Sequence, residues 1–149
     1  MSAGRIMALD IGDRRIGVAF SDETRLIATP HSVYNRVGWG PDVKHLARLY
    51  QEQRAVLIVS GLPLNMDGSE GFQAQKVRAF VQKLTEAGLP VVLMDERLST
   101  VTAHDALIAG GMRREERKGV VDKVAAAVIL QEYLDWQAQK SAAGEPAAF

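Results

Sequence analysis

Residues 5–22 read RIMALDIGDRRIGVAFSD and contain the clearest structural pattern in the chain. Residues 6–9 are uniformly apolar, which predicts a strand covered on both faces of its sheet. A turn at Gly12 follows, and residues 15–20 resume a β-branched, apolar pattern. The segment therefore predicts a β-hairpin whose first strand ends in the carboxylate of Asp10. That carboxylate either bonds the backbone of the turn or contacts a metal ion or a phosphate.

Length and composition are typical of one globular domain. The chain has 149 residues, of which 47% are hydrophobic and 24% are charged, so it can bury a sizeable core. No apolar run approaches the roughly 20 residues of a membrane helix. Cysteine is absent and no signal-like N-terminus is present, so we expect a cytoplasmic protein without disulfides or thiolate metal sites. Three isolated histidines also argue against zinc.

The overall charge does not by itself indicate a nucleic-acid partner. Lys plus Arg and Asp plus Glu number 18 each, so the formal net charge is zero. Basic residues do gather around the hairpin and again within residues 113–118, and such a local group can form a phosphate-binding surface. Ordinary solvated surface charge is the alternative explanation.

The rest of the chain alternates predicted strands and helices. Residues 27–34 predict a third strand, and Pro30 favours a position at the edge of the sheet. The 112–119 segment, MRREERKG, is interpreted as a mobile loop. The remaining predicted elements are a helix at 41–53, a strand at 55–60, a helix from about 72 to 87, a strand at 91–94, a helix from about 99 to 108 and a helix at 120–139. The apolar face of the helix at 72–87 should contain Phe72, Val77, Phe80, Val81 and Leu84.

This order of elements predicts an α/β fold. The first three strands should form an antiparallel meander, and right-handed crossovers should make the later two strands parallel to the first. We expect a five-stranded mixed sheet with helices on both faces. It would form a single domain of residues 1–139, followed by a disordered tail of residues 140–149.

Three acidic side chains could meet at one edge of this sheet. Sites in open α/β sheets gather at the carboxyl ends of parallel strands, where Asp10 and Glu96 fall, and Asp122 falls in the first turn of the last helix. Such carboxylates would repel one another without a cation, and oxygen ligands favour Mg²⁺ or Mn²⁺. Two ions roughly 4 Å apart would suit phosphodiester hydrolysis. Alternatively, Asp122 only stabilises its helix dipole and Glu96 only pairs with Arg97.

Four blocks of sequence resemble those of the YqgF family, whose members are described as candidate Holliday junction resolvases or pre-16S rRNA nucleases. The blocks are ALDIGDRRIGVAFSD, GLPLNMDGSEG, DERLSTVTA and DKVAAAVILQEYL, in this order within residues 5–134. The resemblance implies an RNase H-like fold and a divalent-metal nuclease of the bacterial cytoplasm. It assigns catalytic and metal-binding roles to Asp10, Glu96 and Asp122. It also ranks 5′-end maturation of 16S rRNA above resolution of Holliday junctions.

Further residues are candidates for substrate binding. Asn65, Asp67 and Gly68 of the second block would contact the substrate backbone from a loop beside the metal site, unless that loop is a plain turn. The basic residues would position phosphates without reading sequence. Arg97 and Thr100, which lie near Glu96 in the sequence, could orient Glu96 or bind phosphate, or could only stabilise the following helix. Trp39 and Trp136 could stack on bases, although packing explains such residues more simply. The candidates are Arg14, Asn65, Asp67, Gly68, Arg97, Thr100, Arg113, Arg114, Arg117 and Lys118.

Two other classes of protein compete with a nuclease. A sugar-kinase or actin-like fold also carries an Asp-x-Gly hairpin, but it closes two such domains around ATP, and no second hairpin recurs here. A non-catalytic RNA-binding module, associated with ribosomal particles, is the stronger rival. The acidic set argues against it, because a pure binder gains little from carboxylates beside phosphates. Pre-rRNA or branched DNA as substrate, endo- or exonucleolytic cleavage, and a monomer or a homodimer all remain open.

Overall fold

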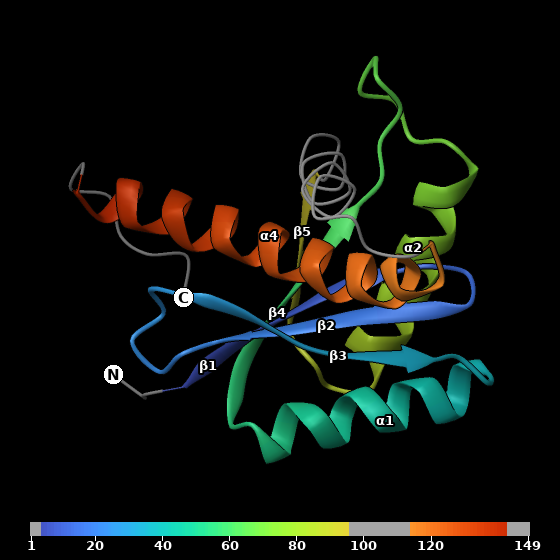
Figure 1. The fold of residues 1–149 in the computed structure, drawn as a ribbon, viewed down its shortest axis with the longest axis horizontal. Helices are drawn as coiled ribbons and strands as arrows, with labels where there is room; N and C mark the ends of the chain where they lie inside the picture. Colours follow the sequence, from blue (N-terminus) through green and yellow to red (C-terminus); the bar gives the residue numbers. More distant parts are fainter. Residues whose placement is uncertain (1–3, 96–113, 143–149) are drawn as a thin grey trace.

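The structure is a computed structural model that describes residues 4–95 and 114–142 of the chain. These residues form one β-sheet with helices on both faces (Figure 1). The strands are β1 (Arg5–Ile11), β2 (Arg15–Ser21), β3 (Ala28–Asn35), β4 (Ala55–Leu62) and β5 (Val91–Asp95), and the helices are α1 (Trp39–Glu52), α2 (Phe72–Glu86) and α4 (Arg114–Ala142).

The sheet has the predicted mixed topology. Within the described part of the chain its strands lie in the order β3-β2-β1-β4-β5. β2 is antiparallel to both β1 and β3, whereas β4 is parallel to β1 and β5 is parallel to β4. Pro30 lies in the edge strand β3, where its missing N–H leaves no gap in the sheet interior. The expected sheet, a three-strand antiparallel meander plus two parallel strands, is therefore confirmed.

The central strand β1 divides its side chains between two hydrophobic cores. Met7 and Leu9 pack in the core that contains residues of α1 and α2, whereas Ile6 and Ala8 pack in the core that contains residues of α4. Successive side chains of a strand point to opposite faces of the sheet. Asp10 follows Ile6 and Ala8 in this alternation, so it lies on the face that α4 covers.

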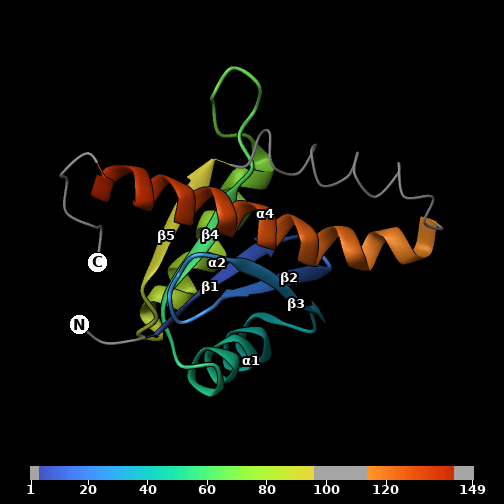
Figure 2. The same ribbon diagram turned by 60° about the vertical axis from the view of Figure 1, so that its left-hand side comes forward.

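Helix α4 lies across the sheet against β1, β2, β3 and β4 (Figures 1 and 2). Its residues 125–127 are buried alanines, and Ile129 and Leu130 are fully buried beyond them. Each such large aliphatic side chain contributes about 1.5–3 kcal/mol through its burial. The closest approach is at Gly17 of β2, where a Cβ atom would overlap the carbonyl oxygen of Asp122. The lack of a side chain at Gly17 allows the helix backbone to rest directly on the strand.

Three local predictions are wrong. The sequence predicts Asp122 in the first turn of the last helix, but it lies eight positions after the first residue of α4. Helix α4 begins at Arg114, so most of the segment interpreted as a mobile loop is helical, because Arg, Glu and Lys are good helix formers and one glycine does not prevent a helix. Phe72 does not belong to the buried stripe of α2. It is the first residue of that helix and is 74% exposed, with the Lys76 ammonium 4.6 Å from its ring centroid.

Some predictions fall wholly or partly outside the described residues. The helix expected at 99–108 lies outside them, and so do residues 143–149 of the expected tail. Residues 140–142 of that tail are the end of α4. Among the helices of residues 4–95 and 114–142, none combines the length and apolar character needed to cross a membrane.

Candidate active site at the carboxyl end of the central strand

Asp10 is held near the end of β1 by its pairing with β2. The antiparallel register sets Asp10 directly opposite Gly17, and residues opposite each other in such a pair point to the same face. The side chain of Asp10 is partly buried. Because its cross-strand neighbour has no side chain, the space beside the Asp10 carboxylate on the α4 face is taken by the backbone of the helix.

Asp122 is the acidic residue that α4 brings to this place. Its carbonyl oxygen lies against Gly17, the partner of Asp10, so the two aspartates come together on one face although 112 positions separate them in the sequence. The Nε of Arg15 donates a hydrogen bond to the Asp122 Oδ2 atom at 2.6 Å. Such a short, charge-assisted bond fixes the orientation of the carboxylate.

A cleft of about 390 Å³ is lined by the β1–β2 turn and by Asp122 of α4. The turn itself is tight, since the Gly12 N–H donates to the Arg15 carbonyl at 2.9 Å. Arg14, one of the predicted substrate-binding residues, is exposed at the wall of this cleft. The cleft combines two carboxylates with two guanidinium groups, an arrangement suited to a phosphodiester and its counterions. Its lining residues are Gly12, Asp13, Arg14, Arg15 and Asp122.

The third predicted acid and several basic candidates are not described. Glu96, Arg97, Thr100 and Arg113 lie outside residues 4–95 and 114–142. Within those residues, no group of three or more His, Asp or Glu side chains could hold a metal ion. Arg114, Arg117 and Lys118 lie in the first turns of α4, on the N-terminal side of Asp122.

The chemistry of the described donors fits a divalent cation in part. Asp10 and Asp122 offer hard carboxylate oxygens from two elements that meet on one face, which suits Mg²⁺ or Mn²⁺. Arg15 bonds one oxygen of Asp122, so the other oxygen is the one suited to a metal. A third ligand has to come from elsewhere, and Glu96 directly follows Asp95, the last residue of β5, in the sequence.

The second-block loop is built largely from bonds among its own residues. The Asn65 N–H donates to the Ser69 carbonyl at 2.9 Å, and the Gly68 N–H donates to the Asn65 carbonyl at 2.8 Å. The Asp67 Oδ1 atom accepts bonds from the Ser69 backbone N–H and hydroxyl, and Gly68 has φ near +87°. Asn65, Asp67 and Gly68 therefore shape a loop that projects from the end of β4 (Figures 1 and 2).

Sequence reasoning missed two parts of this site. Gly17 passed as an ordinary strand residue, although a glycine inside a strand often marks a close backbone approach. Arg15 was noted only as one of several basic residues near the hairpin. Nothing in the local sequence pairs it with Asp122, 107 positions away.

In the described part of the chain, the order of the strands, α1 and α2 on one face and the long helix α4 on the other define an RNase H-like α/β protein, with Asp10 near the end of its central strand. The same fold occurs in Thermus thermophilus RuvC in complex with a Holliday junction substrate, with a TM-score of 0.57 at 15% identity. That match covers 97% of this chain and 98% of the other.

Residues 4–136 match the RuvX family, which is described as Holliday junction resolvase. A relative from Clostridioides difficile (strain 630) is 45% identical over 92% of this chain and 98% of its own length. Another, from Roseiflexus sp. (strain RS-1), is 42% identical over 90% of this chain and 96% of its own length. Both are named as candidate pre-16S rRNA nucleases. The chain belongs to the RuvX family, a family of nucleases that the sequence blocks indicated under the name YqgF.

Proposed function

We propose that this nuclease hydrolyses phosphodiester bonds in the 5′ extension of pre-16S rRNA, using two divalent ions, Mg²⁺ or Mn²⁺. The observation that carries the proposal is the meeting of Asp10 and Asp122 through Gly17, beside a cleft that also holds the side chains of Arg14 and Arg15. The choice of RNA is supported by the names of the relatives at 42–45% identity.

Each side chain at the cleft has a distinct task in this proposal. Asp10 and Asp122, together with Glu96, would hold the ions, while Arg15 keeps the Asp122 carboxylate in place. Arg14, exposed on the turn, would bind a phosphate oxygen next to the cleavage point. Bound ions would supply activation of the attacking water and stabilisation of the leaving oxygen. The carboxylates would act as ligands and not as nucleophiles.

The other basic candidates and Thr100 would contact the backbone of the substrate. They are Arg97, Thr100 and Arg113, together with Arg114, Arg117 and Lys118 of the first turns of α4. They would add affinity that falls with salt concentration and would not add sequence preference. A pre-rRNA substrate implies a cytoplasmic location and contact with assembling ribosomal particles. It also requires only one active site, so a monomer would suffice.

Cleavage of branched DNA is the second candidate function, and the description of the RuvX family favours it. Symmetrical cutting of a four-way junction needs two active sites, so this function would require a homodimer. A non-catalytic RNA-binding role is the remaining rival. The three possibilities differ in substrate, oligomeric state and dependence on the carboxylates.

The deciding experiment offers the full-length protein a 5′-extended 16S rRNA fragment and a four-way DNA junction in parallel, each with Mg²⁺, Mn²⁺ or EDTA. The proposal predicts metal-dependent cutting of the RNA that Asp10→Asn abolishes. Cutting of the junction alone would transfer the function to recombination. RNA binding without cutting, unchanged by Asp10→Asn, would favour the non-catalytic role.

A further inference from the structure

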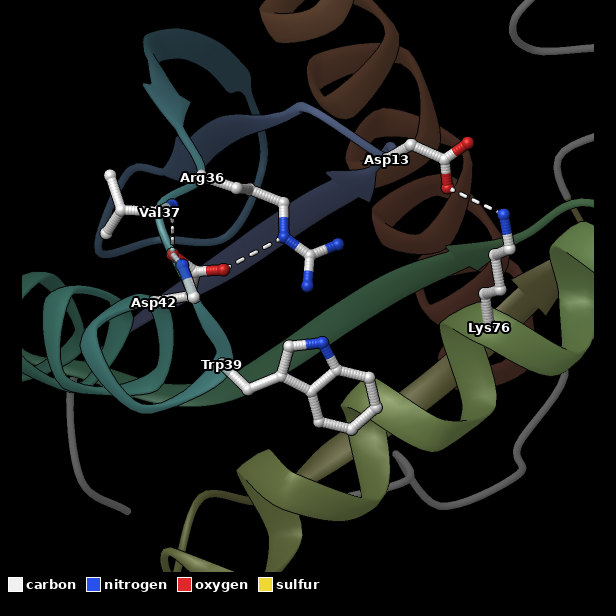
Figure 3. Close-up of a pocket in the computed structure, with 7 residues that line it drawn as sticks. Asp13, Arg36, Val37, Trp39, Asp42 and Lys76 are labelled. Carbon is white, nitrogen blue, oxygen red and sulfur yellow. Dashed lines mark hydrogen bonds and ion pairs between the residues drawn. The ribbon is translucent and has the colours of Figure 1, made fainter.

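A second cleft, of about 500 Å³, lies on the other side of the β1–β2 turn from the cleft of Asp122. It forms where the turn meets the end of β3 and the beginnings of α1 and α2 (Figure 3). Figure 3 shows Arg36 and Trp39 extending into the same space, with Asp13 and Lys76 at its far side. A space of this size is in the range of small-molecule and cofactor sites.

Arg36 is fixed in one orientation within this cleft. Its Nε donates to the Asp42 Oδ2 atom at 3.0 Å, and its Nη1 donates to the Gly12 carbonyl at 2.9 Å. The guanidinium carbon lies 4.6 Å from the centroid of the Phe80 ring. The Nη2 group has no hydrogen-bond partner among the described residues, although the side chain is only 14% exposed. It is a donor already positioned for a ligand that enters the cleft.

Trp39 supplies a large aromatic surface at the same place. It is the first residue of α1 and is 45% exposed. Its ring meets Phe80 edge-on, with centroids 6.0 Å apart and an interplanar angle of 90°, so the indole is held in position. An immobilised, half-exposed indole next to a guanidinium group is the kind of platform on which unpaired bases stack.

The charges in the cleft favour recognition of a base over binding of phosphate alone. Arg36 is neutralised by Asp42, which is 1% exposed. Lys76 pairs with Asp13 at 3.3 Å, and because both side chains are well exposed, this pair stabilises the fold only weakly. A phosphate could compete with Asp13 for Lys76, but the cleft has no net positive charge to attract one. Its distinguishing features are the ring and the unused donor.

The second cleft adjoins the candidate active site at the β1–β2 turn. Asp13 lines both clefts, and Gly12, which lines the first, accepts the hydrogen bond of Arg36 in the second. We propose that the second cleft binds an unpaired nucleotide of the substrate, whose base stacks on Trp39 and accepts a hydrogen bond from Arg36 while the scissile phosphate lies beside Asp122. The inference rests on the proposed nuclease function and defines its substrate as single-stranded next to the cut.

Fluorescence of Trp39 tests this proposal directly. The chain has two tryptophans, so Trp136→Phe leaves Trp39 as the only source of the signal. The probes are an unstructured 12-nucleotide RNA and the same RNA in a duplex, both added in EDTA to prevent cleavage. The single strand should quench the signal strongly and the duplex weakly, because bases in a duplex already stack on both faces. Equal quenching by the two probes, or none by either, would overturn the proposal.

Affinity measurements on variants give a second, independent test. Trp39→Ala should weaken single-strand binding roughly 5- to 150-fold, the range expected for loss of one base stack. Trp39→Phe retains a ring and should lie between wild type and Trp39→Ala, which separates stacking from misfolding. Trp136→Ala removes an equally exposed tryptophan from α4 and should leave the affinity unchanged. An unchanged affinity in Trp39→Ala would contradict the proposal.

The outcomes for the subsite and for the nuclease can be told apart. If Asp10→Asn abolishes cleavage while Trp39→Ala binds as wild type does, the nuclease assignment stands and the nucleotide subsite is wrong. If no substrate is cut but the single strand still quenches Trp39, the subsite stands and the nuclease assignment is wrong.

Discussion

Gly17 of β2 and Asp122 of α4 are in backbone contact, with no room between them for a Cβ atom. Because Gly17 also faces Asp10 across the strand pair, this contact is what joins the two acidic residues. The position of α4 on the sheet and the geometry of the candidate active site are thus determined at the same point.

Substituting Gly17 with alanine should therefore damage both stability and activity. The added methyl group would push α4 away from β2, and overpacking of this kind costs about 1–3 kcal/mol. Gly40→Ala is the matched control, since a Cβ atom at Gly40 of α1 meets nothing within 4 Å. Chemical denaturation should show a lower free energy of unfolding for Gly17→Ala and an unchanged or slightly higher one for Gly40→Ala. Equal stability of the two variants would mean that α4 does not rest on Gly17.

Arg15→Gln should lower cleavage while changing stability little. The Arg15–Asp122 pair is partly exposed, so its loss should cost less than about 1 kcal/mol, but the Asp122 carboxylate would lose its fixed orientation. Lys83→Gln, which breaks an exposed pair with Glu86 on α2, is the control for the loss of one positive charge. The account predicts reduced kcat only for Arg15→Gln. A normal cleavage rate in that variant would show that the ion pair does not position the site.

Asp42 makes the stability of the protein depend on acid pH. Burial alone would raise the pKa of Asp42, but hydrogen bonds from the Val37 N–H and from Arg36 outweigh it and hold the pKa below its usual value. The unfolded chain, with a pKa of about 3.9, then binds a proton more readily than the folded chain. The stabilisation by Asp42 is therefore complete above about pH 4–5 and is lost as the pH falls through the lower, folded-state pKa.

Asp42→Asn tests this dependence. The variant should lose about 3 kcal/mol at neutral pH, because Arg36 remains as a largely buried, unpaired charge. Its stability should also fall less steeply than that of wild type between pH 5 and pH 2, as measured by thermal unfolding. Glu86→Gln on the exposed face of α2 should follow the wild-type curve. If the stability of Asp42→Asn falls with pH as steeply as that of wild type, then Asp42 is not the source of this pH dependence.

Asp67 is expected to act by shaping its loop. Its Oδ1 atom accepts hydrogen bonds from the Ser69 backbone N–H at 2.9 Å and from the Ser69 hydroxyl at 2.6 Å. Asp67→Asn keeps an oxygen at that position and should cleave substrate nearly as wild type does. Asp67→Ala removes the acceptor and should raise KM. If Asn and Ala reduce cleavage equally, the carboxylate charge itself takes part, and the loop has a direct role at the site.

The sequence was sufficient for most of the fold because its strand and turn signals agree with the tertiary structure. The apolar run of β1, the turn at Gly12 and the proline in β3 are local signals, and they indicate the antiparallel meander of β1, β2 and β3 that the structure contains. Prediction failed where a local pattern was ambiguous. Charged residues at the start of α4 suit a helix as well as a solvated loop, and the position of Phe72 on α2 depends on where the helix begins.

The candidate site was predictable only in part, because its residues meet through contacts between segments that are distant in the sequence. The position of Asp10 near a strand end can be read from the sequence. The sequence places Asp122 in the first turn of its helix, but it lies eight positions after Arg114, where α4 begins. Their meeting depends on the approach of α4 at Gly17, and the ion pair with Arg15 spans 107 positions. Asp42 received no role from the sequence, because only the folded chain buries it against Arg36.

The most direct test of the central claim is metal-dependent cleavage by three aspartate variants measured side by side. Asp10→Asn and Asp122→Asn should each reduce the cleavage rate at least 100-fold and weaken Mn²⁺ binding in calorimetry, because each removes a ligand from one shared site. Asp135→Asn, an exposed position further along α4, should cleave and bind Mn²⁺ as wild type does. Normal cleavage or Mn²⁺ binding in either of the first two variants would show that Asp10 and Asp122 do not form the metal site.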